Sequence, residues 1–129
     1  MSKHTLGELQ YAIMRVLWSD GEATTAAVHD ALYPQRGLAP TTIATMLRKM
    51  EDKGVVSHRS EGRQFVYRAT VSEDEVRSSM VGELLDRLFA GDPAALVSHL
   101  VADHDLSEAE LAELRALLAA ADAGEEDNR

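Results

Sequence analysis

The stretch of sequence that decides the fold runs from Ala39 to Arg68 and reads APTTIATMLRKMEDKGVVSHRSEGRQFVYR. Its first half places four apolar residues at the i, i+3, i+4 and i+7 positions of one helical face, namely Ile43, Met46, Leu47 and Met50. Pro40 suits the first position of a helix, and Gly54 suits the position just after its end. The sequence therefore predicts an amphipathic helix between these two residues.

The other side of this helix carries short hydroxyls and cations. Arginine and lysine reach guanine O6 and N7 or phosphate oxygens, and threonine offers a hydroxyl and a methyl group to a base edge. An exposed helical face of this kind suits the major groove of double-stranded DNA. The residues of this helix that are predicted to contact DNA are Thr41, Thr42, Thr45, Arg48 and Lys49.

The second half of the stretch predicts a β-hairpin. Apolar residues, among them Phe65 and Tyr67, flank a Ser-Glu-Gly-Arg turn at residues 60–63, so one face of the hairpin can pack on the helices. Arg59 and Arg63 lie at or near the tip. An ordinary solvated turn is the alternative interpretation. We favour DNA contact for both arginines because they follow this particular helix directly.

Two further helices are predicted upstream. An amphipathic pattern from Leu6 to Leu17 predicts the first, and Thr24 or Thr25 is expected to cap a second that ends in the Tyr-Pro-Gln-Arg-Gly sequence of residues 33–37. Three helices followed by a hairpin are the order of a winged helix-turn-helix. We therefore predict a mainly α fold with a small β-hairpin wing, in which residues 1–70 form a DNA-binding domain.

The rest of the chain is predicted to be helical. Capping boxes of the form Ser-x-x-Glu begin at Ser72 and Ser107, and Asp92 precedes a proline that can start a helix between them. Residues 71–123 are therefore assigned to a helical domain, and the polar residues 124–129 to a flexible tail without a motif.

The apolar stripes of these helices are too wide for the remaining chain to cover. A partner subunit is the simplest cover, and packing back on the winged domain of the same chain is the alternative. We expect a homodimer. The residues predicted to form its interface are Leu84, Leu88, Leu96, Leu100, Leu111, Leu114 and Leu118.

The net charge of −9 is distributed unevenly. Residues 1–70 contain nine Lys/Arg and seven Asp/Glu, whereas residues 71–129 contain four and fifteen. Charges farther apart than a Debye length of about 8 Å are largely screened. The basic surface of the first half can therefore bind phosphate despite the acidic second half, which should make binding sensitive to salt.

Composition limits the other classes of protein. The chain has no cysteine, no apolar signal core near its start and no apolar run of about 18 residues, so we expect a cytoplasmic protein without membrane insertion. It has no nucleotide-binding or hydrolase motif, so no catalytic residue and no cofactor are assigned. His99 and Asp103 share a helical face next to His104, but ligands so few and scattered are a weak signal, and we assign no metal site.

The sequence resembles the BlaI/MecI family of penicillinase repressors along nearly its whole length. The resemblance rests on the order and spacing of four segments, LGELQYAIMRVLW (residues 6–18), TTIATMLRKMEDKGVV (41–56), FVYR (65–68) and LFAGDPAALV (88–97). It implies a homodimeric repressor that binds a dyad, or palindromic, operator and controls β-lactam resistance or a related stress response. A winged-helix module that binds proteins and no DNA is the alternative.

The resemblance also implies which details should differ. The implied DNA contacts coincide with the seven residues predicted above, but Ala39 and Ala44 stand where family members often have polar or basic side chains, so the operator sequence is expected to differ. In the resistance repressors a membrane sensor protease triggers cleavage at an Asn-Phe bond. This chain has His99 and Leu100 at the matching place, and cleavage there is kept as a hypothesis. The cysteine cluster of copper-responsive relatives is missing.

Overall fold

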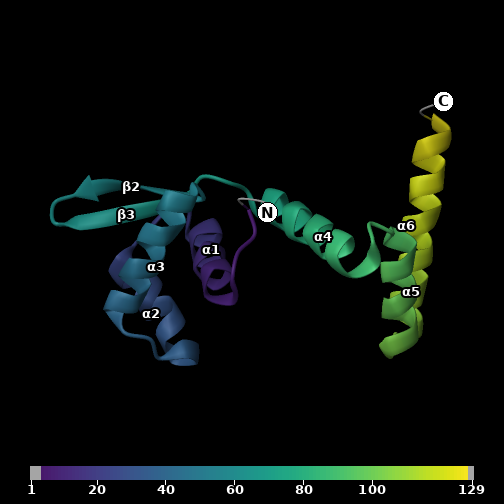
Figure 1. Cartoon of the computed structure of the whole chain (residues 1–129), viewed down its shortest axis with the longest axis horizontal. Coiled ribbons are helices and arrows are strands. Elements are labelled where there is room, and N and C mark those ends of the chain that lie inside the picture. Colours follow the sequence, from purple (N-terminus) through teal and green to yellow (C-terminus); the bar gives the residue numbers. More distant parts are fainter. Residues whose placement is uncertain (1–3, 128–129) are drawn as a thin grey trace.

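The computed structural model describes residues 4–127 and consists of a winged domain from which a helical arm projects (Figure 1). The fold class predicted from the sequence is confirmed: the chain is mainly helical and has a small antiparallel sheet. In chain order the elements are α1 Glu8–Asp20, β1 Ala23–Thr24, α2 Thr25–Arg36, α3 Pro40–Lys53, β2 Val56–Glu61, β3 Gln64–Ala69, α4 Glu73–Phe89, α5 Pro93–Asp103 and α6 Glu108–Asp127.

Helix α3 begins and ends where the sequence predicts. Pro40 occupies its first turn, and Gly54 follows its end with φ of 90°, a left-handed conformation that glycine adopts without steric cost. Ala39 stands at the N-cap and provides no side-chain hydrogen bond. On the inner face Ile43, Leu47 and Met50 are buried, with at most 1% exposure, whereas Met46, the fourth apolar residue predicted there, is only partly buried. The outer face is thereby turned to solvent.

Helix α2 differs from the prediction at its end. Thr24 caps it, because the threonine hydroxyl accepts a hydrogen bond of 3.1 Å from the Ala27 N–H. The helix continues through Pro34 to Arg36, although residues 33–37 were expected to break it. A proline in the last turn removes only one backbone hydrogen bond, and the left-handed Gly37, with φ of 58°, ends the helix instead.

The sheet contains one strand more than predicted. Its order is β1-β3-β2, and the two residues of β1 pair with Val66 and Tyr67 of β3. A strand of two residues is too short to show an alternating pattern in sequence. Strands β2 and β3 form the predicted wing, with Gly62 at φ of 63° in the turn between the paired residues Glu61 and Gln64.

The core lies among α1, α2, α3 and the base of the wing. Tyr67 belongs to it at 2% exposure, whereas Phe65, farther along the same strand, is 44% exposed. The expectation that both rings pack on the helices is therefore met by Tyr67 and not by Phe65, whose ring contacts His58 and Tyr67 of the wing itself. The first turn of α4 also joins the core through the fully buried Val76.

The outer part of α4 and helices α5 and α6 form the arm, which extends away from the winged domain (Figure 1). Many large apolar side chains of the arm are exposed, among them Val81, Leu84, Leu88, Val97, Leu100, Val101, Leu117 and Leu118. Helix α6 continues through Asp127, past residue 124 where a tail was expected, because its last turns are rich in alanine and glutamate, which favour helix. Residues 128 and 129 of that expected tail lie outside the described part of the chain. No helix within the described range is both long and apolar enough to span a bilayer.

We predict that Leu47→Ala lowers the free energy of unfolding by about 2 to 5 kcal/mol, because it leaves a cavity in the core beneath α3. Lys49→Ala, on the outer face of the same helix, should change it by less than about 0.5 kcal/mol. Urea denaturation of both variants at one protein concentration measures the difference. Equal losses would mean that the two faces of α3 are assigned incorrectly.

Candidate nucleic-acid interface

The outer face of α3 presents the predicted contact residues together. Thr41, Thr42, Thr45 and Lys49 are exposed and, with the partly buried Met46, surround a shallow depression of about 280 Å³. Within the described residues, the Lys49 ammonium has no ion pair. Among these residues, therefore, no carboxylate competes with a phosphate or a base for this cation.

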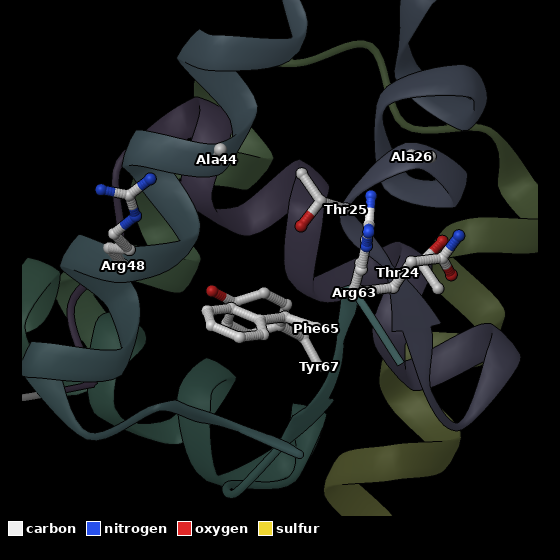
Figure 2. A pocket seen from close by; sticks show the side chains of 9 residues that line it. Thr24, Thr25, Ala26, Ala44, Arg48, Arg63, Phe65 and Tyr67 are labelled. Carbon is white, nitrogen blue, oxygen red and sulfur yellow. The ribbon is translucent and has the colours of Figure 1, made fainter. Parts of the chain in front are cut away.

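A second hollow, of about 330 Å³, lies between α3, the start of α2 and the wing. Figure 2 shows Arg48 and Arg63 on either side of the Phe65 and Tyr67 rings in this hollow. Neither arginine forms an ion pair with any part of the chain that the structure describes. The hollow thus joins α3 to the turn of the wing, with one available guanidinium group on each side.

The hollow includes residues that the sequence did not indicate. Thr25 and Ala26, at the beginning of α2, line it opposite Ala44 of α3 (Figure 2). The small Ala44 side chain leaves this space open. The only local signal for the start of α2 was the capping threonine, and its place beside the wing depends on the pairing of β1 with β3, which the sequence pattern did not reveal.

His58 packs against another ring of the wing and also contacts α3. His58 of β2 stacks on Phe65 with ring centroids 4.1 Å apart, and its Nδ1 lies 2.7 Å from a carboxylate oxygen of Glu51 on α3. Burial raises the pKa of the neighbouring Tyr67 hydroxyl above its ordinary value, so this hydroxyl stays protonated well above neutral pH. The contact with Glu51 places the face of the wing that carries His58 toward α3.

Arg59 does not join the other predicted contact residues. Its Nη1 donates to Glu61 Oε2 at 2.7 Å, and its Nη2 donates to Glu22 Oε1 at 2.8 Å. The hydrogen bond between Arg59 and Glu22 is the main cause that lowers the pKa of the Glu22 carboxyl and raises the pKa of the guanidinium. The structure therefore brings together six of the seven predicted DNA contacts and places the seventh in an ion-pair network.

The histidine considered as a metal ligand has a simpler partner. His99 Nε2 lies 3.0 Å from Asp103 Oδ2 on the same face of α5. No group of three or more histidine and carboxylate side chains within residues 4–127 is arranged to hold a metal ion.

A helix-turn-helix with an adjoining wing and with available cations on the outer face of α3 is typical of a winged-helix DNA-binding protein. The chain belongs to the penicillinase repressor family, whose family model matches residues 6–120. It is 36% identical to a transcriptional regulator BlaI of Mycobacterium tuberculosis over 127 residues, which cover 96% of this chain and 91% of that one. It is 28% identical to a penicillinase repressor of Bacillus licheniformis, with 88% of each chain covered.

A solved structure of the DNA-binding domain of the repressor BlaI is similar to the winged domain. The match has a TM-score of 0.52 and 30% identity, and it covers 57% of this chain and 90% of that domain. The family consists of DNA-binding transcriptional repressors, which are not enzymes. The chain is thus a transcriptional repressor of this family, and the alternative of a winged-helix module without DNA binding is not supported.

We predict that Lys49→Ala weakens operator binding by about 1 to 3 kcal/mol, because an available cation on the groove-facing side of α3 is lost. Fluorescence anisotropy with a duplex selected from random DNA by the wild-type protein measures the change. Arg77→Ala is the matched control, since it removes a cation from α4 that is already paired with Glu73. Unchanged affinity of Lys49→Ala would contradict the assigned groove face.

Proposed function

We propose that the chain is a homodimeric repressor that binds a palindromic operator through two winged domains. The observation that carries this proposal is the arm, in which no residue of α5 is buried and many leucines are exposed. Leu84, Leu88 and Leu100 are between 40% and 65% exposed, and Leu117 and Leu118 are more than 60% exposed. Monomeric proteins rarely leave apolar surface of this extent in water.

A second copy of the chain is the cover that these residues favour. Full burial of a leucine side chain contributes about 1.5 to 3 kcal/mol, so several leucines from each protomer can offset the cost of association, which is about 4 to 15 kcal/mol. The proposed interface consists of the seven leucines identified from the sequence, Leu84, Leu88, Leu96, Leu100, Leu111, Leu114 and Leu118. A two-fold axis through such an interface relates two winged domains, which matches a two-fold operator.

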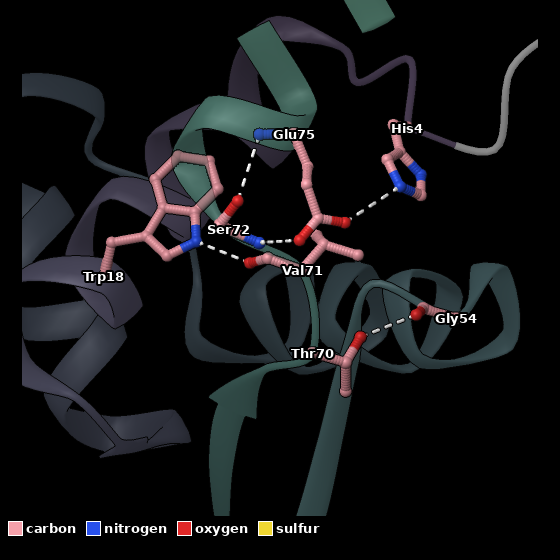
Figure 3. A network of polar contacts seen from close by, with 7 residues as sticks. All are labelled: His4, Trp18, Gly54, Thr70, Val71, Ser72 and Glu75. Atoms are coloured by element: carbon pink, nitrogen blue, oxygen red, sulfur yellow. Dashed lines mark hydrogen bonds and ion pairs between the residues drawn. The ribbon is translucent and has the colours of Figure 1, made fainter. Parts of the chain in front are cut away.

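The junction between the winged domain and the arm supports a defined distance between the two winged domains. Trp18 Nε1 donates to the Val71 carbonyl at 2.9 Å, and Thr70 Oγ1 donates to the Gly54 carbonyl at 2.6 Å (Figure 3). Ser72 and Glu75 form the reciprocal capping box that begins α4 (Figure 3). These bonds fix the start of α4 to the domain, so in the proposed dimer they hold the direction in which α4 leaves each winged domain.

In the proposed complex α3 lies in the major groove. Arg48, Lys49 and the three threonines of its outer face contact bases and phosphates, while Arg63 at the wing turn contacts the adjacent backbone. The acidic arm repels DNA and reduces non-specific binding. We place this activity in the cytoplasm. We also propose a role in β-lactam resistance or a related stress response, which the names of two relatives, methicillin resistance regulatory protein and penicillinase repressor, support.

The proposal is tested by selection of binding sites from random duplex DNA, followed by ultracentrifugation of the complexes. We expect a palindromic site bound by two chains. The double variant Leu114→Asp/Leu118→Asp should be monomeric and bind this site weakly, because the two half-sites are no longer linked. A non-palindromic site, or an unchanged dimer in the double variant, would contradict the proposed arrangement.

We further propose that a membrane sensor protease system relieves repression by cleavage at His99–Leu100. This bond lies in α5, where the His99 side chain is 55% exposed and Leu100 is 43% exposed. Cleavage would separate α6 from the winged domain and remove part of the proposed interface. N-terminal sequencing of fragments from induced cells checks this prediction, and an intact chain that has left its operator would contradict it.

A further inference from the structure

Arg59 connects the two outer strands of the sheet across the middle strand. It lies on β2, while Glu22 immediately precedes β1, and β3 runs between these two strands. The 2.8 Å bond from Arg59 to Glu22 therefore spans the sheet, and the 2.7 Å bond to Glu61 continues along β2 toward the turn. One guanidinium holds two carboxylates from different parts of the chain, which its planar fork of donors permits.

This network lies on the face of the wing that points away from α3. Successive side chains of a strand point to opposite faces, and His58, the neighbour of Arg59, contacts Glu51 of α3. Arg59 is therefore directed away from the recognition helix and lines neither hollow. A phosphate that approached Arg59 would also meet two carboxylates, whereas Arg63 at the turn forms no ion pair within the described part of the chain.

The wing needs support of this kind. Strand β1 pairs only with Val66 and Tyr67, so the outer wing beyond that pairing is a two-stranded hairpin, a structure that is marginally stable by itself. The direction of this hairpin is held by two contacts, from His58 to Glu51 on one face and from Arg59 to Glu22 on the other.

We propose that Arg59 is a positioning residue: the Glu22–Arg59–Glu61 clamp holds the wing at the angle that places Arg63 and Phe65 beside α3, and Arg59 itself does not contact DNA. This inference rests on the proposed operator binding. It deepens that proposal, because it assigns the two wing arginines different tasks. Exposed ion pairs contribute little to global stability. Loss of the clamp should therefore change the direction of the wing without unfolding the domain.

The sign of the effect of Glu22→Gln on operator binding separates the two roles. If Arg59 is a clamp, the substitution releases the wing and weakens binding by about threefold or more, although it removes a negative charge. If Arg59 contacts phosphate, the same substitution frees the arginine and tightens binding. Glu8→Gln is the matched control, since it removes a carboxylate from α1 that is ion-paired with Arg36 at 3.4 Å, and it should change affinity by less than about twofold.

Hydrogen exchange in the free protein gives a readout that does not depend on DNA. With the clamp broken by Glu22→Gln or Arg59→Gln, backbone amides of residues 57–68 should exchange faster, while those of α1 and α3 and the thermal midpoint stay as in the wild type. Absence of operator binding by the wild-type protein would refute the proposed function and leave this readout standing. Unchanged exchange in both variants, or tighter binding by Glu22→Gln, would overturn the clamp.

Discussion

Burial of one face of α3 is the interaction on which the rest of the structure depends. Ile43, Leu47 and Met50 are at most 1% exposed, and together they fix the rotation of the helix about its own axis. Because the side chains of a helix are rigidly spaced, this rotation alone turns the threonines and cations of the other face outward. Burial of apolar side chains, which is unrelated to DNA, thereby determines which polar side chains of α3 are exposed and available for the proposed DNA contacts.

The chain is divided into a part that is stable by its own packing and a part that is not. The winged domain has a continuous core from Leu6 to Val76, whereas α5 buries none of its residues. The charge follows the same division, since residues 71–129 hold fifteen of the acidic side chains and only four cations. If the arm is the proposed dimer interface, a signal that acts on it can release DNA without unfolding the domain.

Local signals in the sequence were sufficient for most of the fold. The boundaries of α3, the cap at Ser72 and the turn at Gly62 each depend on residues within one helical turn, so each could be predicted, whereas the cap of α2 was narrowed only to Thr24 or Thr25. Strand β1 could not, because two residues form a strand only through their pairing with β3. The continuation of α2 past Pro34 was missed for a related reason, since the position of the next left-handed glycine outweighed the proline.

The candidate site shows the same limit at the level of single side chains. Periodicity identified the outer face of α3 correctly as exposed, but it could not distinguish Arg59 from Arg63, which lie four residues apart on one hairpin. What separates them is a carboxylate from Glu22, 37 residues away from Arg59 in sequence and 2.8 Å away in space. A cation on a DNA-binding surface can therefore act through its charge or through the geometry of its hydrogen bonds. Which of these two roles a cation has depends on its neighbours in the folded chain, so the number of basic residues in the sequence does not reveal it.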